Sequence, residues 1–427
     1  MKLVQRAPAD HPEEQRRAND WRILLVIFTL AGVVESQAFG HLNAFTPLYL
    51  QQLHVPATQI PRWTGILASL GFVLGLPLLP FWGIWADRYS RKLIIVRSAY
   101  IEGVLFTIAA LSPNVWVLAL ARFLVGFVFG NTGVMLALLA DVTPRKRLGL
   151  AVGIASAGFP LGSSIGPLLG GLIAQGLGIR VLLLGDAGLS ALMGIALTVI
   201  VREGSRTATS SSTVTGMLKA SMRDILDTPV VLRLFVVYFI AMYGISLINP
   251  YLPILLQRLY TGPSRLLPSM IGTTLAVAGI AMGITTPIWG KVGDLAGRWR
   301  ILPIALAGVA AGIAVEGLAA ALGWLQAGIV GVGLFQGGIG TTIIALLALL
   351  APEERRASIL NLSLLPSQLS WFVGPITAAL MTSVALRLPF AAGVVALLIA
   401  TAFSAMTARL APAAGEAEAG GSDLAAN

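Results

Sequence analysis

The sequence lacks cysteine altogether and has few charged residues and only three histidines. Without cysteine the chain has no disulfides, no thiolate metal sites and no thiol catalysis. Charged residues make up 11% of the chain, which is about half the share typical of a soluble domain. The histidines, at positions 11, 41 and 54, do not have the spacing of a zinc site. The low share of charged residues indicates that most of this chain lies in lipid. The missing cysteines and the histidine spacing lead us to expect no metal centre.

Motifs of other function classes are missing as well. No phosphate-binding Gly-Lys-Ser/Thr loop is present, so ATP hydrolysis by that route is excluded and we expect no enzyme. The polar N-terminal segment lacks the regions of a cleaved signal peptide. The net charge of +10 would suggest nucleic acid in a soluble protein. Here the basic residues lie in short loops between apolar runs, which is typical of membrane orientation, so we expect no nucleic-acid partner.

Long apolar runs dominate the chain. A membrane-spanning helix needs about 20 apolar residues, and twelve runs of that order fall at 22–47, 62–85, 93–111, 115–139, 148–175, 179–201, 230–256, 270–290, 301–322, 325–350, 357–383 and 388–409. They are continuously apolar, whereas strands of a membrane barrel are shorter and alternate in polarity. The sequence predicts an all-α membrane protein with twelve transmembrane helices.

One long loop divides these runs into two sets of six. The predicted organisation is a cytoplasmic N-terminal segment, a six-helix half, a cytoplasmic linker, a second six-helix half and a disordered cytoplasmic tail, over 1–21, 22–201, 202–229, 230–410 and 411–427. The linker contains a flexible Ser/Thr run and a short stretch with the pattern of an interfacial helix. Most Lys and Arg residues fall on one side of the membrane, which predicts that both termini are cytoplasmic. The loops of the other side hold Arg62, Arg180, Arg258, Arg265 and Arg387.

The two halves repeat one another. Segment 47–53 resembles segment 253–259 at an offset of 206, and three further matches follow at nearly the same offset. These matches are Gly83 and Asp87 with Gly290 and Asp294, Pro144 with Pro352, and Gly166-Pro167 with Gly374-Pro375. Two six-helix repeats in the same orientation predict a secondary transporter with its site between the halves at mid-membrane.

The turn from Gly83 to Lys92 joins the second and third runs. Asp87 lies there beside Arg88 and Arg91, and an acid in such a cluster can form charge-assisted bonds that lock one of two conformations. The alternative is a basic cytoplasmic loop with an incidental acid. That alternative explains the basic residues, but it explains neither Asp87 nor its recurrence as Asp294. We therefore interpret the turn as a latch at the inner face.

The fifth run carries a string of small residues. Small residues allow close helix packing, and a proline inside a span removes one backbone bond and permits a bend. The string consists of Gly153, Gly162, Gly166, Pro167, Gly170 and Gly171. The alternative is ordinary small-residue packing, but six fixed positions are more specific than a single pair. We predict that this run forms the packing seam between the halves.

These motifs resemble the signatures of the major facilitator superfamily, and they are most similar to those of its twelve-helix drug:proton antiporters. The turn 83–92 is similar to the loop 2–3 signature, with Ser90 in place of the usual second glycine, and the fifth-run string is similar to the antiporter signature. Arg122 with Gly126 resembles the Arg-x-x-x-Gly signature of the fourth span. Asp141 resembles an acid at the inner end of the same span, so we count Asp141 among the latch residues. The resemblance implies proton-driven export by alternating access.

Charged residues within the predicted spans include Glu35, Glu102, Arg122, Asp186 and Glu316. Such residues are costly and are functional candidates by default. The resemblance implies that spans one, four, seven and ten line the cavity, so Glu35 is predicted to bind the proton or a cationic substrate and Arg122 to act as its fixed-charge partner. The alternative for Glu35 is a structural hydrogen-bonded acid. Glu102, Asp186 and Glu316 are expected to be structural.

Polar and aromatic residues near these charges are candidates for the cavity wall. They suit lipophilic ligands, although each alone is more often a packing residue or an interfacial anchor. The candidates are Gln37, His41, Asn43, Tyr238, Tyr243, Asn249 and Gln336. His41 is not expected to be the coupling site.

The predicted function is proton-coupled efflux of small lipophilic or cationic compounds, as in multidrug resistance. We expect a monomer in the cell inner membrane whose partners are a small-molecule substrate, protons and the lipid bilayer. No cofactor is expected, because the proton gradient supplies the energy. One alternative is an exporter of an endogenous metabolite, sugar or lipid. The other is a membrane sensor or scaffold that transports nothing, against which the intact fifth-run string argues.

Overall fold

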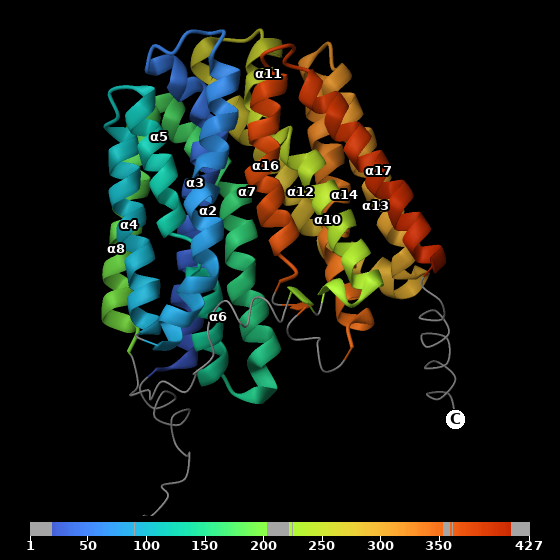
Figure 1. Ribbon diagram of the computed structural model, residues 1–427. Helices are drawn as coiled ribbons and strands as arrows, with labels where there is room; N and C mark the ends of the chain where they lie inside the picture. The colour runs from blue at the N-terminus through green and yellow to red at the C-terminus, as the bar shows by residue number, and fades with distance from the viewer. Residues whose placement is uncertain are drawn as a thin grey trace, which may run out of the picture.

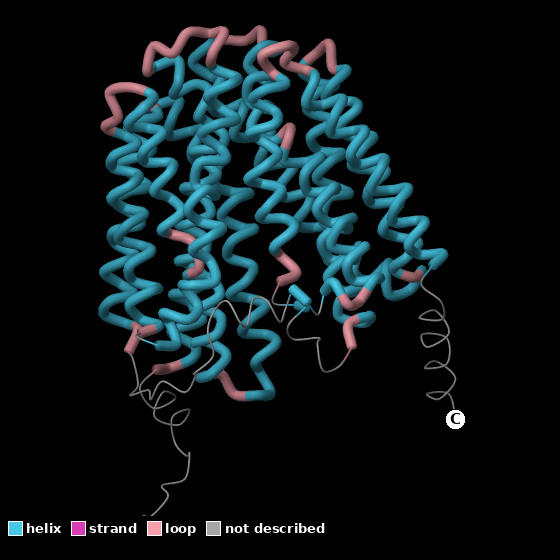
Figure 2. Tube along the Cα trace, viewed as in Figure 1, coloured by secondary structure: helices cyan, strands magenta, loops and turns pink. Residues whose placement is uncertain are grey.

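The computed structural model describes residues 19–88, 90–202, 222–223, 225–352, 359–360 and 362–410, apart from the side chains of 79–80, 83–84, 87–88 and 410. The predicted disordered tail lies outside these residues, and so does most of the predicted linker. All regular secondary structure of the described part is helical (Figure 2). The predicted all-α class is therefore confirmed.

The first half of the chain contains α2 (Trp21–Gln52), α3 (Ile60–Arg88), α4 (Arg91–Ala110), α5 (Val115–Leu124), α6 (Asn131–Val142), α7 (Leu148–Leu177) and α8 (Ile179–Ile200). The second half contains α10 (Pro229–Ser246), α11 (Leu252–Leu259), α12 (Leu267–Ala296), α13 (Arg298–Leu318), α14 (Leu322–Leu350), α16 (Leu365–Met381) and α17 (Leu388–Leu410). Among the described residues, eleven helical segments are long and apolar enough to cross a membrane. The 17-residue α16 occupies the place of the remaining predicted span.

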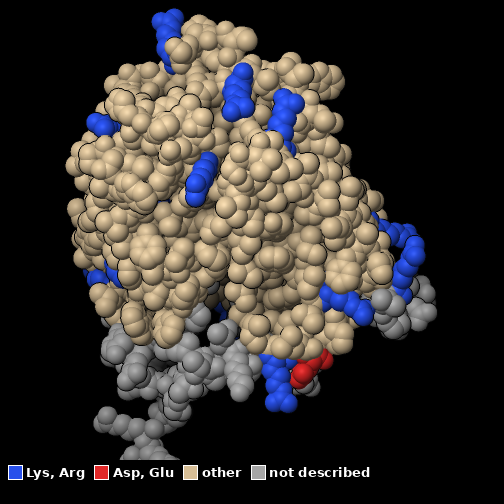
Figure 3. All heavy atoms as spheres, turned by 45° about the horizontal axis from the view of Figure 1, so that its top comes forward, with Lys and Arg blue, Asp and Glu red and all other residues tan. Residues whose placement is uncertain are grey.

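The outer surface of the helices is apolar. Large hydrophobic side chains are widely exposed along their length, for example Val199 at 71% and Leu318 at 79%. Figure 3 shows that uncharged residues cover most of the visible surface and that the Lys and Arg side chains on it are scattered. Extended apolar surface of this kind is not stable in water, but it is favourable against lipid tails. The chain is a multi-pass membrane protein.

The two sets of helices lie side by side, with α2–α8 on one side of the molecule and α10–α17 on the other (Figure 1). The principal contacts between the sets are α7 with α12 and α3 with α16. The start of α2, the end of α8 and the end of α17 lie at one end of the bundle, which we call the terminal face. The loop between α2 and α3 lies on the opposite face.

Two of the predicted spans are interrupted in the structure. The fourth is divided into α5, a short 3-10 turn at Val125–Phe127 and α6. Gly130, which precedes α6, has a φ of 91°, and a Cβ there would lie 2.7 Å from the Trp82 Cβ, so only glycine fits without strain. The seventh span is likewise divided into α10, a 3-10 turn at Asn249–Tyr251 and α11. Broken helices of this kind are found in membranes where the irregular backbone is buried in protein or lines a cavity.

Candidate functional site

A central cavity of about 550 Å³ lies between the two halves. Both halves contribute to its wall, which is largely apolar and contains the aromatic residues Phe39, Phe72, Phe129, Phe159 and Trp371. Five residues of the predicted sites line it, namely Asn43, Arg122, Pro167, Asn249 and Gln336. An apolar wall with a few polar groups is the usual construction of a small-molecule site.

One face of α2 forms part of this wall. Ser36, Phe39, Gly40, Asn43 and Ala44 line the cavity, and their spacing of three to four residues marks a single helix face. The predicted cavity residues Gln37 and His41, and the predicted substrate acid Glu35, lie on α2 outside that face. The helical period, about 100° per residue, explains why neighbours in the sequence point elsewhere.

The two predicted tyrosines of α10 also lie outside the cavity lining. Tyr238 is buried in the second half. The Tyr243 hydroxyl donates to Thr377 Oγ1 at 3.0 Å, and its ring stacks with that of Phe239. Both tyrosines therefore serve packing within the second half.

Arg122 brings a fixed positive charge to the cavity wall. Its Nε donates to the carbonyl of Leu67 at 3.0 Å and its Nη2 donates to Asn43 Oδ1 at 3.2 Å. The side chain is 6% exposed. Gly126, one helical turn further on, permits this position because a Cβ there would lie 2.6 Å from Leu74 Cβ on α3. The Arg-x-x-x-Gly pair thus holds the broken fourth span closely against α3.

Glu316 on α13 is a cavity residue that sequence reasoning placed among the structural acids. It lines the cavity together with Ile329 and Gly333 of α14, and its side chain is 2% exposed. Gly328 explains this position, because a Cβ at Gly328 would lie 2.8 Å from Glu316 Cγ. The missing side chain lets the acid pass beside the α14 backbone. Within the described lining residues, Glu316 is the one acid and Arg122 the one base.

Glu35 lies in a different place from the one predicted. Its Oε2 accepts a hydrogen bond of 2.8 Å from Asn131 Nδ2, at the start of α6. Both residues line a second, much smaller cavity that Glu102 of α4 also lines. No hydrogen bond or ion pair joins Glu35 to Arg122 within the described part of the chain. The break before α6 explains why Glu35 does not meet Arg122, because it places Asn131 beside the Glu35 carboxyl group instead.

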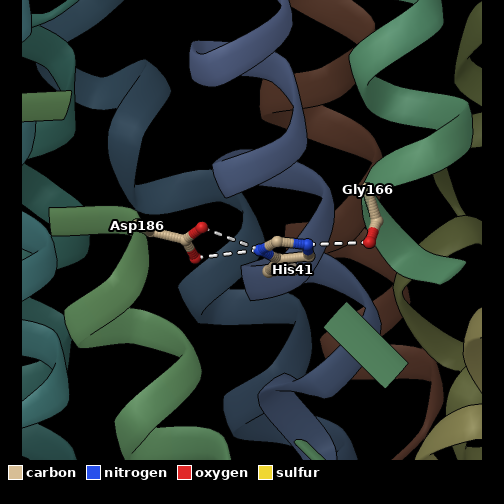
Figure 4. Close-up of polar contacts among 3 residues, drawn as sticks. All are labelled: His41, Gly166 and Asp186. Atoms are coloured by element: carbon tan, nitrogen blue, oxygen red, sulfur yellow. Dashed lines mark hydrogen bonds and ion pairs between the residues drawn. The ribbon is translucent and has the colours of Figure 1, made fainter. Parts of the chain in front are cut away.

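A second buried polar group joins α2, α7 and α8 (Figure 4). His41 Nδ1 lies 2.9 Å from both carboxyl oxygens of Asp186, and its Nε2 lies 2.7 Å from the carbonyl oxygen of Gly166. His41 is 3% exposed and Asp186 is 2% exposed. The sequence placed His41 in the cavity wall and treated Asp186 as structural, because the two residues are 145 positions apart and nothing local connects them.

The small residues of α7 face two partners. Gly162, Gly166 and Gly170 pack against α2 of the same half, where added side chains would overlap α2 atoms. Gly171 packs against α12 of the other half, since its Cβ would lie 2.7 Å from the carbonyl oxygen of Pro268. A Cβ at Gly153 would meet no atom within 4 Å. The glycine string is therefore mainly a contact within the first half, and its last member belongs to the seam between the halves.

Part of the predicted latch is visible at the terminal face. Arg91 Nη1 lies 2.6 Å from Asp141 Oδ2, which joins the start of α4 to the end of α6. Ser90 caps α4, because its hydroxyl oxygen accepts a hydrogen bond from the Leu93 amide at 2.9 Å. This cap explains why serine suits a position where the resemblance implies glycine. Asp294 forms an ion pair with Arg298, four residues further on. The side chains of Asp87 and Arg88 lie outside the described part, so their roles stay predictions.

The opposite face carries a contact between the repeats. Gln51 Nε2 donates to Gln257 Oε1 at 2.9 Å, and Gln257 Nε2 donates to Gln51 Oε1 at 3.2 Å. The two residues are 206 positions apart, which is the offset of the repeated segments that contain them. Equivalent residues of the two halves thus bond to each other across the pseudo-symmetry axis.

Comparisons with known proteins agree with this architecture. The chain matches the Major Facilitator Superfamily over residues 27–264 and again over 234–425. It is 30% identical over 296 residues to the multidrug resistance protein MdtG of Escherichia coli, which covers 69% of this chain and 72% of that protein.

Solved structures are similar in fold. A bacterial homologue of the human lysosomal transporter Spinster, in an inward-facing and unoccupied conformation, has a TM-score of 0.72 at 17% identity, over 91% of this chain and 97% of that one. The nucleoside transporter NupG has a TM-score of 0.71 at 14% identity, over 91% and 98% of the two chains.

Proposed function

Because the chain belongs to the major facilitator superfamily, a family of transporters rather than enzymes, we propose that it exports small lipophilic or cationic compounds by alternating access in exchange for protons. The identity to a multidrug resistance protein supports efflux as the direction. The membrane is the inner membrane, both termini are cytoplasmic and the working unit is a monomer. No cofactor takes part.

The observation that carries the proposal is the central cavity. It is large enough for a drug-sized molecule, it is lined from both halves, and its wall combines aromatic rings with the two opposed charges Arg122 and Glu316. A lipophilic cation fits this wall, because its apolar body packs against the rings while Glu316 supplies the counter-charge. Movement of one half against the other exposes such a cavity to either side in turn.

We propose that the proton and the substrate bind at separate places. Glu35 is the proposed proton acid, and it lies with Glu102 beside a small cavity rather than on the central wall. Glu316, rather than Glu35, attracts a cationic substrate. Arg122 acts at the cavity wall as a fixed charge, since guanidinium groups keep their proton in proteins.

Proteoliposomes test the transport proposal. Purified protein is reconstituted with a pH-sensitive dye inside, and ethidium, a neutral lipophilic drug and an anionic metabolite are offered in turn. We expect ethidium to move protons in the opposite direction. Proton-independent movement of the anion alone would favour the metabolite exporter, in which Arg122 binds the substrate. Absence of any substrate-dependent flux would overturn the transport proposal.

Glu35 is tested in everted vesicles. We expect Glu35→Gln to lower proton-driven ethidium transport about tenfold or more, because the amide cannot carry a proton, in line with typical general acid–base contributions. The control is Asp227→Asn, an exposed acid whose surface ion pair contributes little. Undiminished transport by Glu35→Gln would remove this acid from the mechanism.

A further inference from the structure

The contacts of His41 with Asp186 and Gly166 determine which atoms of this group carry hydrogens. The Gly166 carbonyl oxygen only accepts hydrogen bonds, so the His41 Nε2 facing it at 2.7 Å carries a hydrogen. The His41 Nδ1 faces both oxygens of Asp186 at 2.9 Å. An ionised carboxylate also only accepts, so Nδ1 must then carry a hydrogen as well, which makes the ring an imidazolium. Otherwise the ring is neutral and Asp186 is the protonated partner.

Either arrangement contains one proton more than a neutral ring beside an ionised carboxylate. Without that proton, one of the two contacts would place an acceptor against an acceptor. The side chains are almost completely buried, so water does not readily replace the lost hydrogen bond. The observed geometry is therefore that of a loaded proton site.

The other ionisable side chains on the helices that carry or contact the pair include acids and bases: Arg22, Glu35 and Tyr49 on α2, Arg91, Lys92, Arg97, Tyr100 and Glu102 on α4, and Arg180 on α8. The carboxyl of Glu102 on α4 lies within electrostatic range of Asp186 and of Glu35 on α2. No ionisable side chain occurs on α7. On α5, Arg122 bonds to Asn43 of α2 and to the Leu67 carbonyl.

The ionisable residues of α3, α6, α11 and α12 are confined to the helix ends: Arg62, Asp87, Arg88, Asp141, Arg258, Lys291 and Asp294. Loss of the proton from the His41 pair leaves a net negative charge on two buried side chains. Such a charge is costly in lipid and favours a conformation that admits water.

The pair is connected directly to the seam between the halves. Gly170 makes room for the ring, because a Cβ there would lie 2.6 Å from His41 Nε2, and Gly166 supplies the acceptor. The next residue, Pro167, packs against Gly272 of α12, whose Cβ would lie 2.9 Å from the Pro167 carbonyl carbon. One peptide unit of α7 therefore separates the histidine contact from the contact with the other half.

We propose that the His41–Asp186 pair binds a proton that is exchanged for substrate, and that its release breaks the His41–Gly166 hydrogen bond and loosens α7 at the seam. The inference rests on the proposed proton-coupled export and assigns it a second proton site besides Glu35. The proton leaves from the imidazolium to water in the state open to the cytoplasm, and the pair returns to a neutral ring beside a carboxylate. The two α7 glycines nearest the ring thereby acquire a role in coupling.

Transport measurements separate coupling from movement. We expect His41→Gln and Asp186→Asn each to lower pH-gradient-driven ethidium transport about tenfold, within the usual range of coupling effects, while ethidium movement down its own gradient is kept. The matched control is His54→Asn in an exposed loop, where the residue has a φ of 59° that asparagine tolerates. Undiminished driven transport in both pair variants would overturn the inference.

Nuclear magnetic resonance tests the native side chains. With His11→Gln and His54→Asn, His41 is the only histidine left, and ¹⁵N labelling reports both ring nitrogens. Spectra are recorded across a pH series, and we expect ethidium to change the ¹⁵N signals of the ring, because substrate and proton are exchanged at this pair in the proposal. An unchanged spectrum with and without ethidium would identify a structural ion pair and overturn the inference. If wild-type protein shows no ethidium-dependent proton flux, the export proposal fails, and this titration still decides whether His41 binds a proton.

Discussion

At the scale of single residues, Glu316 shows how one missing side chain determines which residues line the cavity. It lies on α13, which is not among the helices that the resemblance places around the cavity. It nevertheless faces the central cavity, because Gly328 leaves space beside α14 for its carboxyl group. Its side chain has no hydrogen-bond partner within the described residues. A buried acid without an internal partner favours a cationic ligand at this wall.

Glu316→Gln tests that role. We expect the apparent affinity for ethidium to fall about tenfold, equivalent to ~1.4 kcal/mol, while a neutral lipophilic substrate is transported as before, because only the counter-charge is removed. Competition transport assays in proteoliposomes measure both. Asp227→Asn is again the control for loss of an exposed acid. Equal loss for the neutral and the cationic compound would show that Glu316 serves the fold rather than the substrate.

At the scale of elements, α7 connects the interior of the first half to the second half. Its glycines face α2 over most of its length, and Gly171 with Pro167 faces α12. Helix association in lipid depends on close packing of this kind, since the hydrophobic effect does not drive it. A change in the last turns of α7 therefore acts on the seam directly.

Gly171→Ala is expected to reduce transport several-fold without preventing insertion, because the new Cβ would lie 2.7 Å from a backbone oxygen that cannot rotate away. Gly176→Ala on the same helix is the control, since its Cβ would meet no atom within 4 Å. Transport rate per inserted molecule is the measurement. Equal rates for the two variants would contradict the seam assigned to α7 and α12.

At the scale of the whole molecule, the two halves meet at the face opposite the termini. The reciprocal bonds of Gln51 and Gln257 join α2 to α11 there, and the two residues are equivalent in the repeat. In the proposed alternating access, this contact opens in the other state. The pair is therefore a marker of the conformation that the structure shows.

The absence of native cysteine makes that contact easy to test. We expect the double variant Gln51→Cys and Gln257→Cys, joined by a bifunctional methanethiosulfonate reagent, to lose ethidium transport and to recover it with a reductant, because the tether keeps the two halves together at this face. Each single variant is a control. A cross-linked protein that transports at the uncrosslinked rate would show that the contact need not open.

The sequence by itself determined the class of the protein, because the relevant signals are local or periodic. The apolar runs predicted nearly every span, the repeat offset predicted two equivalent halves, and the motifs around Arg122 and in α7 indicated the family. These features depend on length, composition and spacing, which lipid constrains strongly. The interruptions of the fourth and seventh spans were missed, because long apolar runs continue on both sides of the local signals at Gly130 and Asn249-Pro250.

Only the tertiary structure decided which charged residues meet. Glu35 lies beside Asn131 because α6 starts after a break, and Glu316 reaches the cavity because Gly328 has no side chain. His41 and Asp186 are brought together across 145 residues by the packing of α2 with α8. Such pairings depend on helix rotation and close approach, which are set by contacts distant in the chain and are not encoded in any single stretch of it.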